Sequence, residues 1–298
     1  MRNNNMNSTA ATATTAIAQS APLNVVQPRL QGKDVGIPVR KMGLSYDNSM
    51  PTLWFNNNAF LTMLFSGFSA TLPAGENHFM HSVRLFQDQI TDPVLMAQVR
   101  AFIGQEAHHS KEHDTLNQAM KARGVDLGRI EKRMLSMTKM WKAKLSPKQQ
   151  LAMTVCAEHF TALLADFTLS KHPEVLDMIA PEVRKIWAWH SIEETEHKAV
   201  AFDVYQQLIG DRALLRRTMV PVTILFMATS LNNALSLMPR AEMTNWKMWK
   251  ESLAMVRMLT TATWTEYKDF YNADFHPWMH DNRKAIELAK RTYLDGAL

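Results

Sequence analysis

The chain has 298 residues, enough for one large domain or two of ordinary size, and Cys156 is its only cysteine. A single cysteine excludes an intramolecular disulfide, so we expect a reducing, cytoplasmic location. The net charge of +5 comes from dispersed lysines and arginines without an arginine-rich block, which argues against a nucleic-acid partner. Only 10 glycines against 21 methionines, with long stretches rich in Ala, Leu, Lys, Gln and Glu, favour an all-α fold.

The first part of the chain differs in composition from the rest. Residues 1–38 are rich in Asn, Ser, Thr and Ala and poor in acids, so we expect a disordered or extended arm rather than a secretory signal. Residues 39–298 should form a single helical domain that holds two metal ions. Its core bundle is expected at about residues 74–210, after an apolar helix that ends at Pro73, and further helices should cover residues 211–298.

Four long helices are predicted inside this core by apolar periodicity and by proline or glycine at their ends. They cover residues 73–90, 92–124, 146–173 and 181–210, and a shorter helix reaching Lys144 lies between the second and the third. Short connections between the long helices predict an up-and-down four-helix bundle of the ferritin-like kind, with additional N- and C-terminal helices.

The segment 219–238 is apolar over about 20 residues, the length that crosses a bilayer. Pro221 near its start and Asn232 and Asn233 in its interior favour a buried helix or a subunit interface, as in a homodimer. The alternative is peripheral contact with a membrane surface through this segment, which would make the protein membrane-associated.

The sequence WHSIEETEH, which runs from Trp189 to His197, combines three acids and two histidines inside a predicted helix. Residues at i, i+4 and i+7 project within about 60° of one another on a helix, so His190, Glu194 and His197 form one stripe. Glu196 points away from that stripe. A metal ion is the obvious occupant, but other helices must supply the remaining ligands.

Two Glu-x-x-His pairs occur on separate long helices, Glu106 with His109 and Glu194 with His197. Two such pairs and one glutamate from each of two other helices match the ligand plan of di-iron and di-manganese carboxylate proteins. Glu76 could instead merely complement a helix dipole. The seven predicted metal ligands are Glu76, Glu106, His109, Glu158, His190, Glu194 and His197.

Four further side chains are candidates for roles around these ligands. His113 lies one turn beyond His109 and could be an extra ligand, a partner of a ligand or a proton carrier. Glu193, Asp166 and Asp203 could orient ligand imidazoles, because a metal-binding histidine usually needs an acceptor on its other nitrogen.

Three stretches, LPAGENHFMHSVR, DPVLMAQVRAFIGQEAHHSKEH and WAWHSIEETEHKAVAFDVY, closely resemble the bacterial family called predicted metal-dependent hydrolase, within the ferritin-like superfamily. This resemblance extends over most of residues 40–270, and it implies a metal-dependent enzyme without naming a substrate. The ligand order, with His190 preceding Glu194 and His197, is also similar to that of the di-iron arylamine N-oxygenases, in which the extra histidine binds one iron. Outside the ligand positions little of that second family is seen, so its amine substrate is not carried over.

Nitrogen-rich carboxylate sites suit iron and oxygen, so the residues favour two iron ions and an O2-dependent oxidoreductase with an external electron donor. A peroxo-di-iron species would oxidise an apolar or aromatic small molecule. The first alternative is a binuclear hydrolase that uses metal-activated water, with Mn or Zn in place of iron. The second is a non-catalytic, iron-handling helical protein. Four aromatic residues are consistent either with an apolar substrate site or with ordinary core packing: Phe102, Phe160, Trp187 and Phe202.

Overall fold

The computed structural model describes residue 32 and residues 35–294, which belong to one compact unit. The regular elements of these residues are helices, as the composition predicted, and an isolated antiparallel bridge joins Phe55 to Ile179. Of the predicted N-terminal arm, all but residues 32 and 35–38 lie outside the described residues. Residues 36–47 contain neither helix nor strand.

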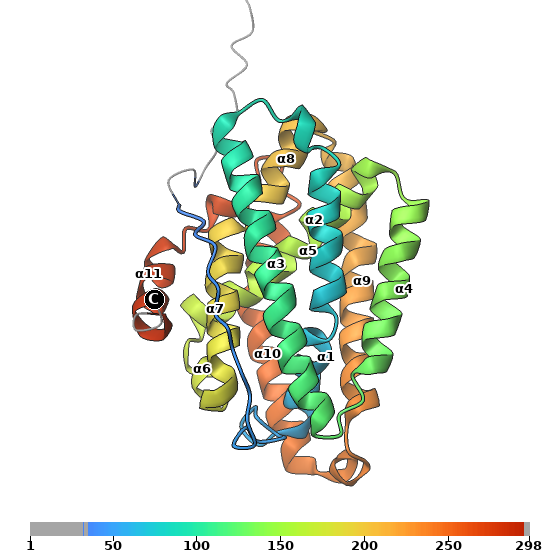
Figure 1. Cartoon of the computed structure of the whole chain (residues 1–298), viewed down its shortest axis with the longest axis vertical. Coiled ribbons are helices and arrows are strands. Elements are labelled where there is room, and N and C mark those ends of the chain that lie inside the picture. Colours follow the sequence, from blue (N-terminus) through green and yellow to red (C-terminus); the bar gives the residue numbers. More distant parts are fainter. Residues whose placement is uncertain (1–31, 33–34, 295–298) are drawn as a thin grey trace, which may run out of the picture. The chain divides into compact units, whose positions relative to one another are not determined.

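The four long helices expected to carry metal ligands are present and adjoin one another (Figure 1). They are α2 (Leu72–Arg84), α3 (Pro93–Ala122), α5 (Pro147–Asp166) and α7 (Pro181–His197). Both α3 and α5 contact α2 and α7, so the four helices enclose a common interior. This arrangement gives a site between the helices access to side chains from all four.

Local sequence explains where two of these helices begin. The Asp92 side chain accepts hydrogen bonds from the backbone N–H groups of Val94 and Leu95, and Pro93 occupies the first helical position of α3. At the start of α5, Ser146 and Gln149 form a capping box, and Pro147 occupies the first helical position. Both starts agree with the sequence predictions.

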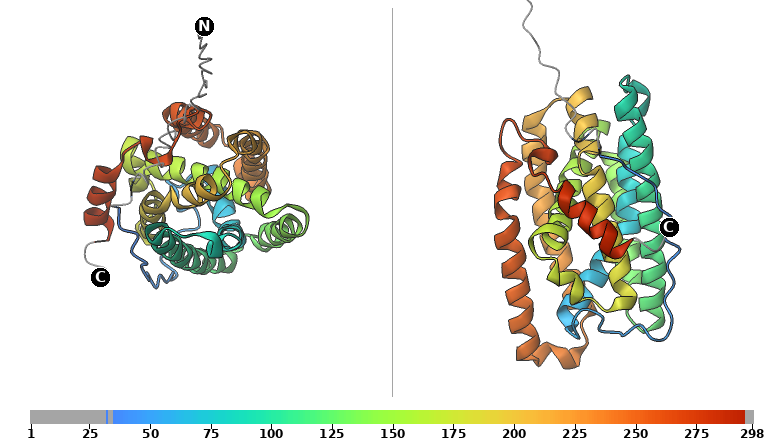
Figure 2. Two further views of the ribbon diagram at one scale, coloured as in Figure 1. Left: turned by 90° about the horizontal axis from the view of Figure 1, so that it is seen from above. Right: turned by 90° about the vertical axis from the view of Figure 1, so that its left-hand side faces the viewer.

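Further helices pack against these four on several sides, as seen from two more directions in Figure 2. The helices α1 (Ala59–Ser69) and α5 pack against α9 (Arg212–Leu237), whereas α4 (Gly128–Lys144) packs against α2 and α10 (Trp246–Asp269) against α5. The shorter elements are η1 (Gln87–Gln89), η2 (Phe167–Lys171), α6 (Glu174–Asp177), α8 (Val200–Leu208), η3 (Arg240–Thr244), η4 (Pro277–Met279) and α11 (Arg283–Tyr293).

Two predicted helices are interrupted. The helix expected over 181–210 breaks directly after His197, and α8 begins at Val200. At this break the buried Lys198 donates from Nζ to the His280 carbonyl oxygen and to Asn282 Oδ1, which gives its ammonium group acceptors in the C-terminal segment. The helix expected over 146–173 changes at Asp166 into the π-helical turn η2, whose wider turn alters the direction of the following side chains.

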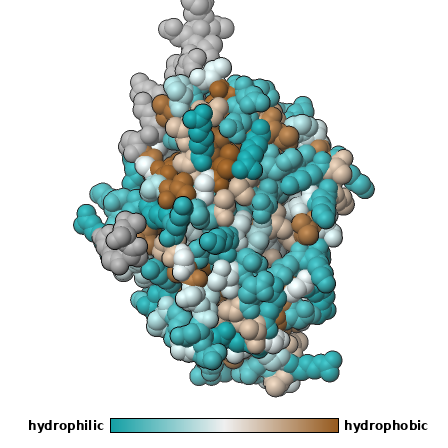
Figure 3. Space-filling view, in the orientation of Figure 1, coloured by the Kyte–Doolittle hydropathy of each residue, from teal (hydrophilic) through white to brown (hydrophobic). Residues whose placement is uncertain are grey.

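The apolar helix α9 is packed on one face and open on the other. Its buried residues include Leu215 and Met219, whereas Ile224 is 64% exposed and Met227 is 51% exposed. The helix is therefore not the fully buried core helix that the sequence suggested as one reading. In the described part of the chain, α9 is the one helix that has the length and composition to cross a membrane. The face of the molecule turned to the viewer in Figure 1 is mainly hydrophilic, with small apolar areas in its upper part (Figure 3).

Candidate metal centre

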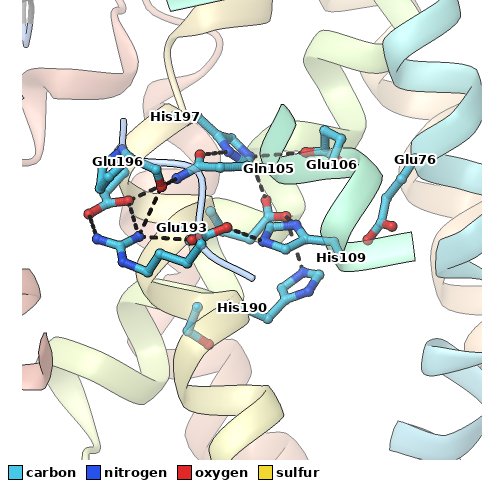
Figure 4. Close-up of polar contacts among 12 residues, drawn as sticks. Glu76, Gln105, Glu106, His109, His190, Glu193, Glu196 and His197 are labelled. Atoms are coloured by element: carbon cyan, nitrogen blue, oxygen red, sulfur yellow. Dashed lines mark hydrogen bonds and ion pairs between the residues drawn. The ribbon is translucent and has the colours of Figure 1, made fainter. Parts of the chain in front are cut away.

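Six of the predicted ligands form two buried groups that could each hold a metal ion. The first group combines Glu76, His109 and His190 from α2, α3 and α7. The second combines Glu106, Glu194 and His197 from α3 and α7. Within each group the ligand atoms lie within 4.8 Å of one another. Figure 4 shows the labelled side chains of both groups projecting into the space between the helices.

Glu194 lies between the two groups. Its Oε1 is 3.1 Å from His190 Nε2 and 3.5 Å from His109 Nδ1, both in the first group. Its Oε2 is 3.5 Å from His197 Nε2 in the second group. A carboxylate with one oxygen toward each group has the geometry of a bridging ligand.

Glu158 completes the set from α5. Its Oε2 lies 3.5 Å from His197 Nε2, and Glu106 Oε1 lies 3.1 Å from the same nitrogen. Glu158 is 2% exposed although it sits in an otherwise apolar part of α5. The structure thus brings together all seven side chains that the sequence predicted as ligands.

The polar atoms of this cluster fit bound cations. Several have no hydrogen-bond partner among the described residues although they are buried, and such atoms are rare in folded proteins. They are Glu76 Oε1, both carboxylate oxygens of Glu106 and of Glu158, Glu194 Oε2, and the Nε2 atoms of His190 and His197. Carboxylate oxygens and imidazole nitrogens are the donors that Mn, Fe and Zn accept.

Burial controls the charge of the carboxyl groups. It raises the pKa of Glu76 well above its usual value, and the charge of Glu106 adds to this effect. Burial likewise raises the pKa of Glu158, with a further contribution from Glu194. Without cations, both groups therefore favour the protonated form.

His109 and His197 keep a raised pKa in spite of burial, whereas burial lowers the pKa of His190 to about 4. Burial disfavours the charged form of His109, but contacts with Glu193 and Glu194 raise its pKa well above the usual value. The pKa of His197 is also raised despite burial, by Glu194 and Glu106. Without cations, His109 and His197 therefore favour the protonated form, and their positive charge offsets the negative charge of the neighbouring carboxylates.

Gln105 fixes the proton of His197. The Gln105 Nε2 donates to the Pro38 carbonyl oxygen and to Glu196 Oε2, so its Oε1 faces His197 Nδ1 at 2.8 Å. An amide oxygen only accepts, so His197 Nδ1 carries the proton when the ring is neutral. The lone pair of Nε2 then points toward the glutamates, as a ligand requires.

A second chain of hydrogen bonds fixes His190. Asn117 Nδ2 donates to the Ser69 carbonyl oxygen, and the Ser69 hydroxyl donates to Asn117 Oδ1 at 2.7 Å. The hydroxyl oxygen therefore accepts from His113 Nδ1 at 2.9 Å, and His113 Nε2 accepts from His190 Nδ1 at 3.0 Å. This order leaves the lone pair of His190 Nε2 toward Glu194. Burial lowers the pKa of His113 well below its usual value, which keeps this ring neutral.

Glu193, which was predicted to orient a ligand imidazole, lies beside His109. Glu193 Oε2 lies 3.1 Å from His109 Nε2, and Glu193 Oε1 accepts from Arg40 Nη1 at 2.9 Å. Burial opposes ionisation of Glu193, but contacts with His109 and Arg40 lower its pKa below the usual value. Glu193 therefore stays ionised as the acceptor for a ligand imidazole.

Asp166 and Asp203 lie elsewhere. Asp166 accepts from Asn282 Nδ2 at 3.1 Å and pairs with Lys171 at 3.3 Å, and Asp203 pairs with His276 Nε2 at 3.0 Å. The prediction that these two acids orient ligand imidazoles is therefore corrected, because both bind the C-terminal part of the chain or the π-helical turn. The positions of Asp166 on α5 and of Asp203 on α8 do not indicate which distant segment of the chain packs against them.

Residues 38–44, called the N-terminal strap below, form a part of the site that the sequence did not reveal. The strap runs along α3 and α7 (Figure 1). Arg40 binds Glu196 and Glu193, and the backbone N–H groups of Gly43 and Leu44 donate to the carboxylate of Glu112 at 2.9 and 2.8 Å. A Cβ atom on Gly104 would lie 2.6 Å from Val39 Cγ2, so a glycine allows this close approach.

An all-helical protein with a buried cluster of glutamates and histidines, supplied by four helices, belongs to the metal-dependent class. The family described as predicted metal-dependent hydrolase matches residues 38–281, and the chain belongs to this family. The resemblance to the predicted metal-dependent hydrolase family is thereby confirmed. Neither a curated protein nor a solved structure gives a significant match to the chain.

Family membership corrects the expected reaction. The sequence favoured an O2-dependent di-iron oxidoreductase, and this expectation is wrong, since the family is described as hydrolytic. The hydrolase alternative agrees with the family. The reason for the error is chemical: carboxylates and imidazoles hold metals for water activation as well as for oxygen chemistry, so ligand type alone does not separate the two.

Proposed function

We propose that the protein is a binuclear metal-dependent hydrolase. The observation that carries this proposal is Glu194, whose two oxygens face the two separate ligand groups. One ion would be held by the first group and the second by the other, with Glu158 beside His197. When bound, divalent ions supply Lewis acidity and lower the pKa of a coordinated water.

The chain's own residues orient the ligands. Gln105 keeps the His197 proton on Nδ1, and His113 keeps the His190 proton on Nδ1. We assign His113 as a positioning residue for His190, in place of the ligand or proton-carrier roles considered from sequence. The Glu193 carboxylate lies 3.1 Å from His109 Nε2, and Arg40 holds Glu193. Such outer contacts typically contribute 10- to 100-fold to metal affinity or activity.

The burial of the cluster also excludes bulk water. Glu106, His109 and His197 are 0% exposed and Glu158 is 2% exposed, so bulk solvent does not reach these ligands. In a dry site the charges of the carboxylates act more strongly than they would at the surface. Mn, Zn and Fe all suit this mixed oxygen and nitrogen donor set, and we propose one of these three as the native metal.

Metal analysis combined with a hydrolysis assay tests this function. Wild-type protein loaded separately with Mn, Zn or Fe should hydrolyse a member of a panel of esters, amides and phosphate esters at the same rate with and without O2. Chelation should abolish the activity and metal should restore it. Glu194→Gln should lose at least 100-fold in rate, whereas Glu182→Gln, on the exposed start of α7, should be unaffected. Activity that survives in metal-free protein, or that requires O2, would refute the proposal.

A further inference from the structure

A largely apolar cavity adjoins the first ligand group. It has a volume of about 130 Å³ and lies between α2, α4, α5 and α9. Most of its wall is formed by aromatic side chains, methionines and aliphatic residues, among them Phe79, Met137, Met153, Phe160, Leu225 and Phe226. Such a concave apolar site with few polar groups is typical of a small-molecule pocket.

Glu76 connects the cavity to the metal cluster. It lines the cavity, is 1% exposed, and belongs to the ligand group that includes His109 and His190. Its Oε2 accepts from the Ser110 hydroxyl at 2.8 Å, whereas its buried Oε1 has no hydrogen-bond partner among the described residues. A molecule in the cavity can therefore place one end beside the proposed metal site.

The charge of the wall restricts what can bind. Arg133 is the one cationic residue that lines the cavity in the described structure, and it donates to the Asn233 side-chain oxygen. A nucleotide or another polyanion would need more cationic partners than this wall offers. The volume is close to that of an apolar cavity of about 150 Å³ that binds benzene, so a phenyl ring or a short alkyl chain fits.

We infer that this cavity binds the apolar part of an uncharged ester, with the ester group at the Glu76 end. This inference rests on the proposed hydrolase function and names its substrate class. In the reaction, the hydroxyl of water is added to the acyl carbon, the ester C–O bond breaks, and the proton goes to the departing alcohol oxygen. The products are an acid and an alcohol, and no oxidant or reductant is consumed.

Of the aromatic residues considered from sequence, Phe160 lines this cavity, and the other three pack elsewhere. Phe102 lies edge-on to the His197 ring, with the ring centroids 4.9 Å apart. Trp187 stacks on Trp54, and Phe202 contacts Phe275 and His276. These three therefore serve in packing, and the substrate cavity is formed mainly by residues of α2, α4, α5 and α9.

Substitutions on α9 test the cavity. Leu225→Trp should fill it, whereas Ile224→Trp adds the same ring at the neighbouring, 64% exposed position. Benzyl alcohol is the probe, and its binding to metal-free protein is followed by ligand-observed NMR, so no catalysis is needed. We expect wild type and Ile224→Trp to bind alike and Leu225→Trp to bind at least 10-fold more weakly. Equal binding by all three would overturn the inference.

A second cavity-filling variant, Met137→Trp, approaches from α4 and covers the case in which Leu225→Trp fails to fold. Circular dichroism and thermal melts report folding for each variant.

Metal-loaded protein is then assayed with p-nitrophenyl hexanoate and p-nitrophenyl acetate. Filling the cavity should lower kcat/KM at least 10-fold for the hexanoate relative to the acetate. Probe binding without hydrolysis of either ester would overturn the ester assignment and leave the apolar cavity standing, whereas hydrolysis without probe binding would overturn the cavity and leave the hydrolase.

Discussion

Arg40 and Glu196 form a bidentate ion pair across 156 residues of sequence. Arg40 Nη1 and Nη2 each donate to a different oxygen of Glu196 at 2.8 Å. Lys290 from α11 reaches Glu196 Oε1 at 2.9 Å, and Gln105 donates to Oε2 at the same distance. Glu196, which points away from the metal stripe, therefore joins the strap, α3, α7 and α11 behind the ligands. Paired Arg and carboxylate groups of this planar geometry are among the stronger charged contacts in proteins.

Removal of this guanidinium should destabilise the fold. Arg40→Ala leaves Glu193 and Glu196 buried with fewer partners, and loss of one member of a buried ion pair costs about 3 kcal/mol. The free energy of unfolding is measured by urea titration at pH 7. Lys41→Ala, on the exposed neighbouring residue, should change it by less than about 0.5 kcal/mol. An Arg40→Ala variant as stable as the Lys41→Ala control would show that the Arg40 ion pairs contribute no net stability.

The two ligand groups should respond differently to substitution. His190→Ala removes a nitrogen from the first group only, so we expect the metal content to fall from two ions per chain to one. Glu194→Gln affects both groups and should reduce both ions. Metal content is measured by mass spectrometry of the dialysed protein, with Glu182→Gln as the control. A wild-type protein that holds a single ion at saturating metal would contradict the two-ion arrangement.

His113 should act through His190. His113→Leu removes the acceptor for His190 Nδ1–H and should weaken metal binding at the first group by about 10- to 100-fold. The second group, with His197 held by Gln105, should keep its affinity. Isothermal titration distinguishes the two binding steps. His108→Leu, on the neighbouring half-buried residue, is the matched control. Equal weakening of both steps would point to a general structural defect instead.

Metal binding should release protons. The pKa values of Glu76 and Glu158 are raised by burial, and those of His109 and His197 are raised by neighbouring glutamates in spite of burial. A proton held below these pKa values must leave before the metal binds, so affinity should increase with pH until the groups are deprotonated. Titration at pH 7 in two buffers of different ionisation enthalpy measures the release. Identical heats in both buffers would contradict this linkage.

The helices and their ligands could be predicted because both depend on local spacing. Asp92 with Pro93, and Ser146 with its capping box, specify helix starts within a few residues. His190, Glu194 and His197 lie on one face because a helix repeats every 3.6 residues. Glu76 and Glu158 could be predicted as ligands because a two-metal site of this plan takes one glutamate from each of two further helices.

The parts of the site that could not be predicted depend on contacts between distant segments, which residue spacing along the chain does not encode. Arg40 lies in a segment without periodicity, so nothing in its neighbourhood indicates that its partner is Glu196. Asp203 was considered as an acceptor for a ligand imidazole, but the helix breaks after His197 and Asp203 pairs with His276 instead. The reaction was misjudged because the same donors serve several metals and several chemistries.

The strap also constrains the order in which the chain can assemble. Residue 40 leaves the ribosome long before residue 196, so the ion pair between Arg40 and Glu196 cannot form until α7 has been synthesised. Because closing so long a loop is entropically costly, we expect this contact to form late in folding. Arg40→Ala should accordingly speed unfolding more than it slows refolding. The strap is thus synthesised early, and we expect it to pack against α3 and α7 only after the bundle has formed.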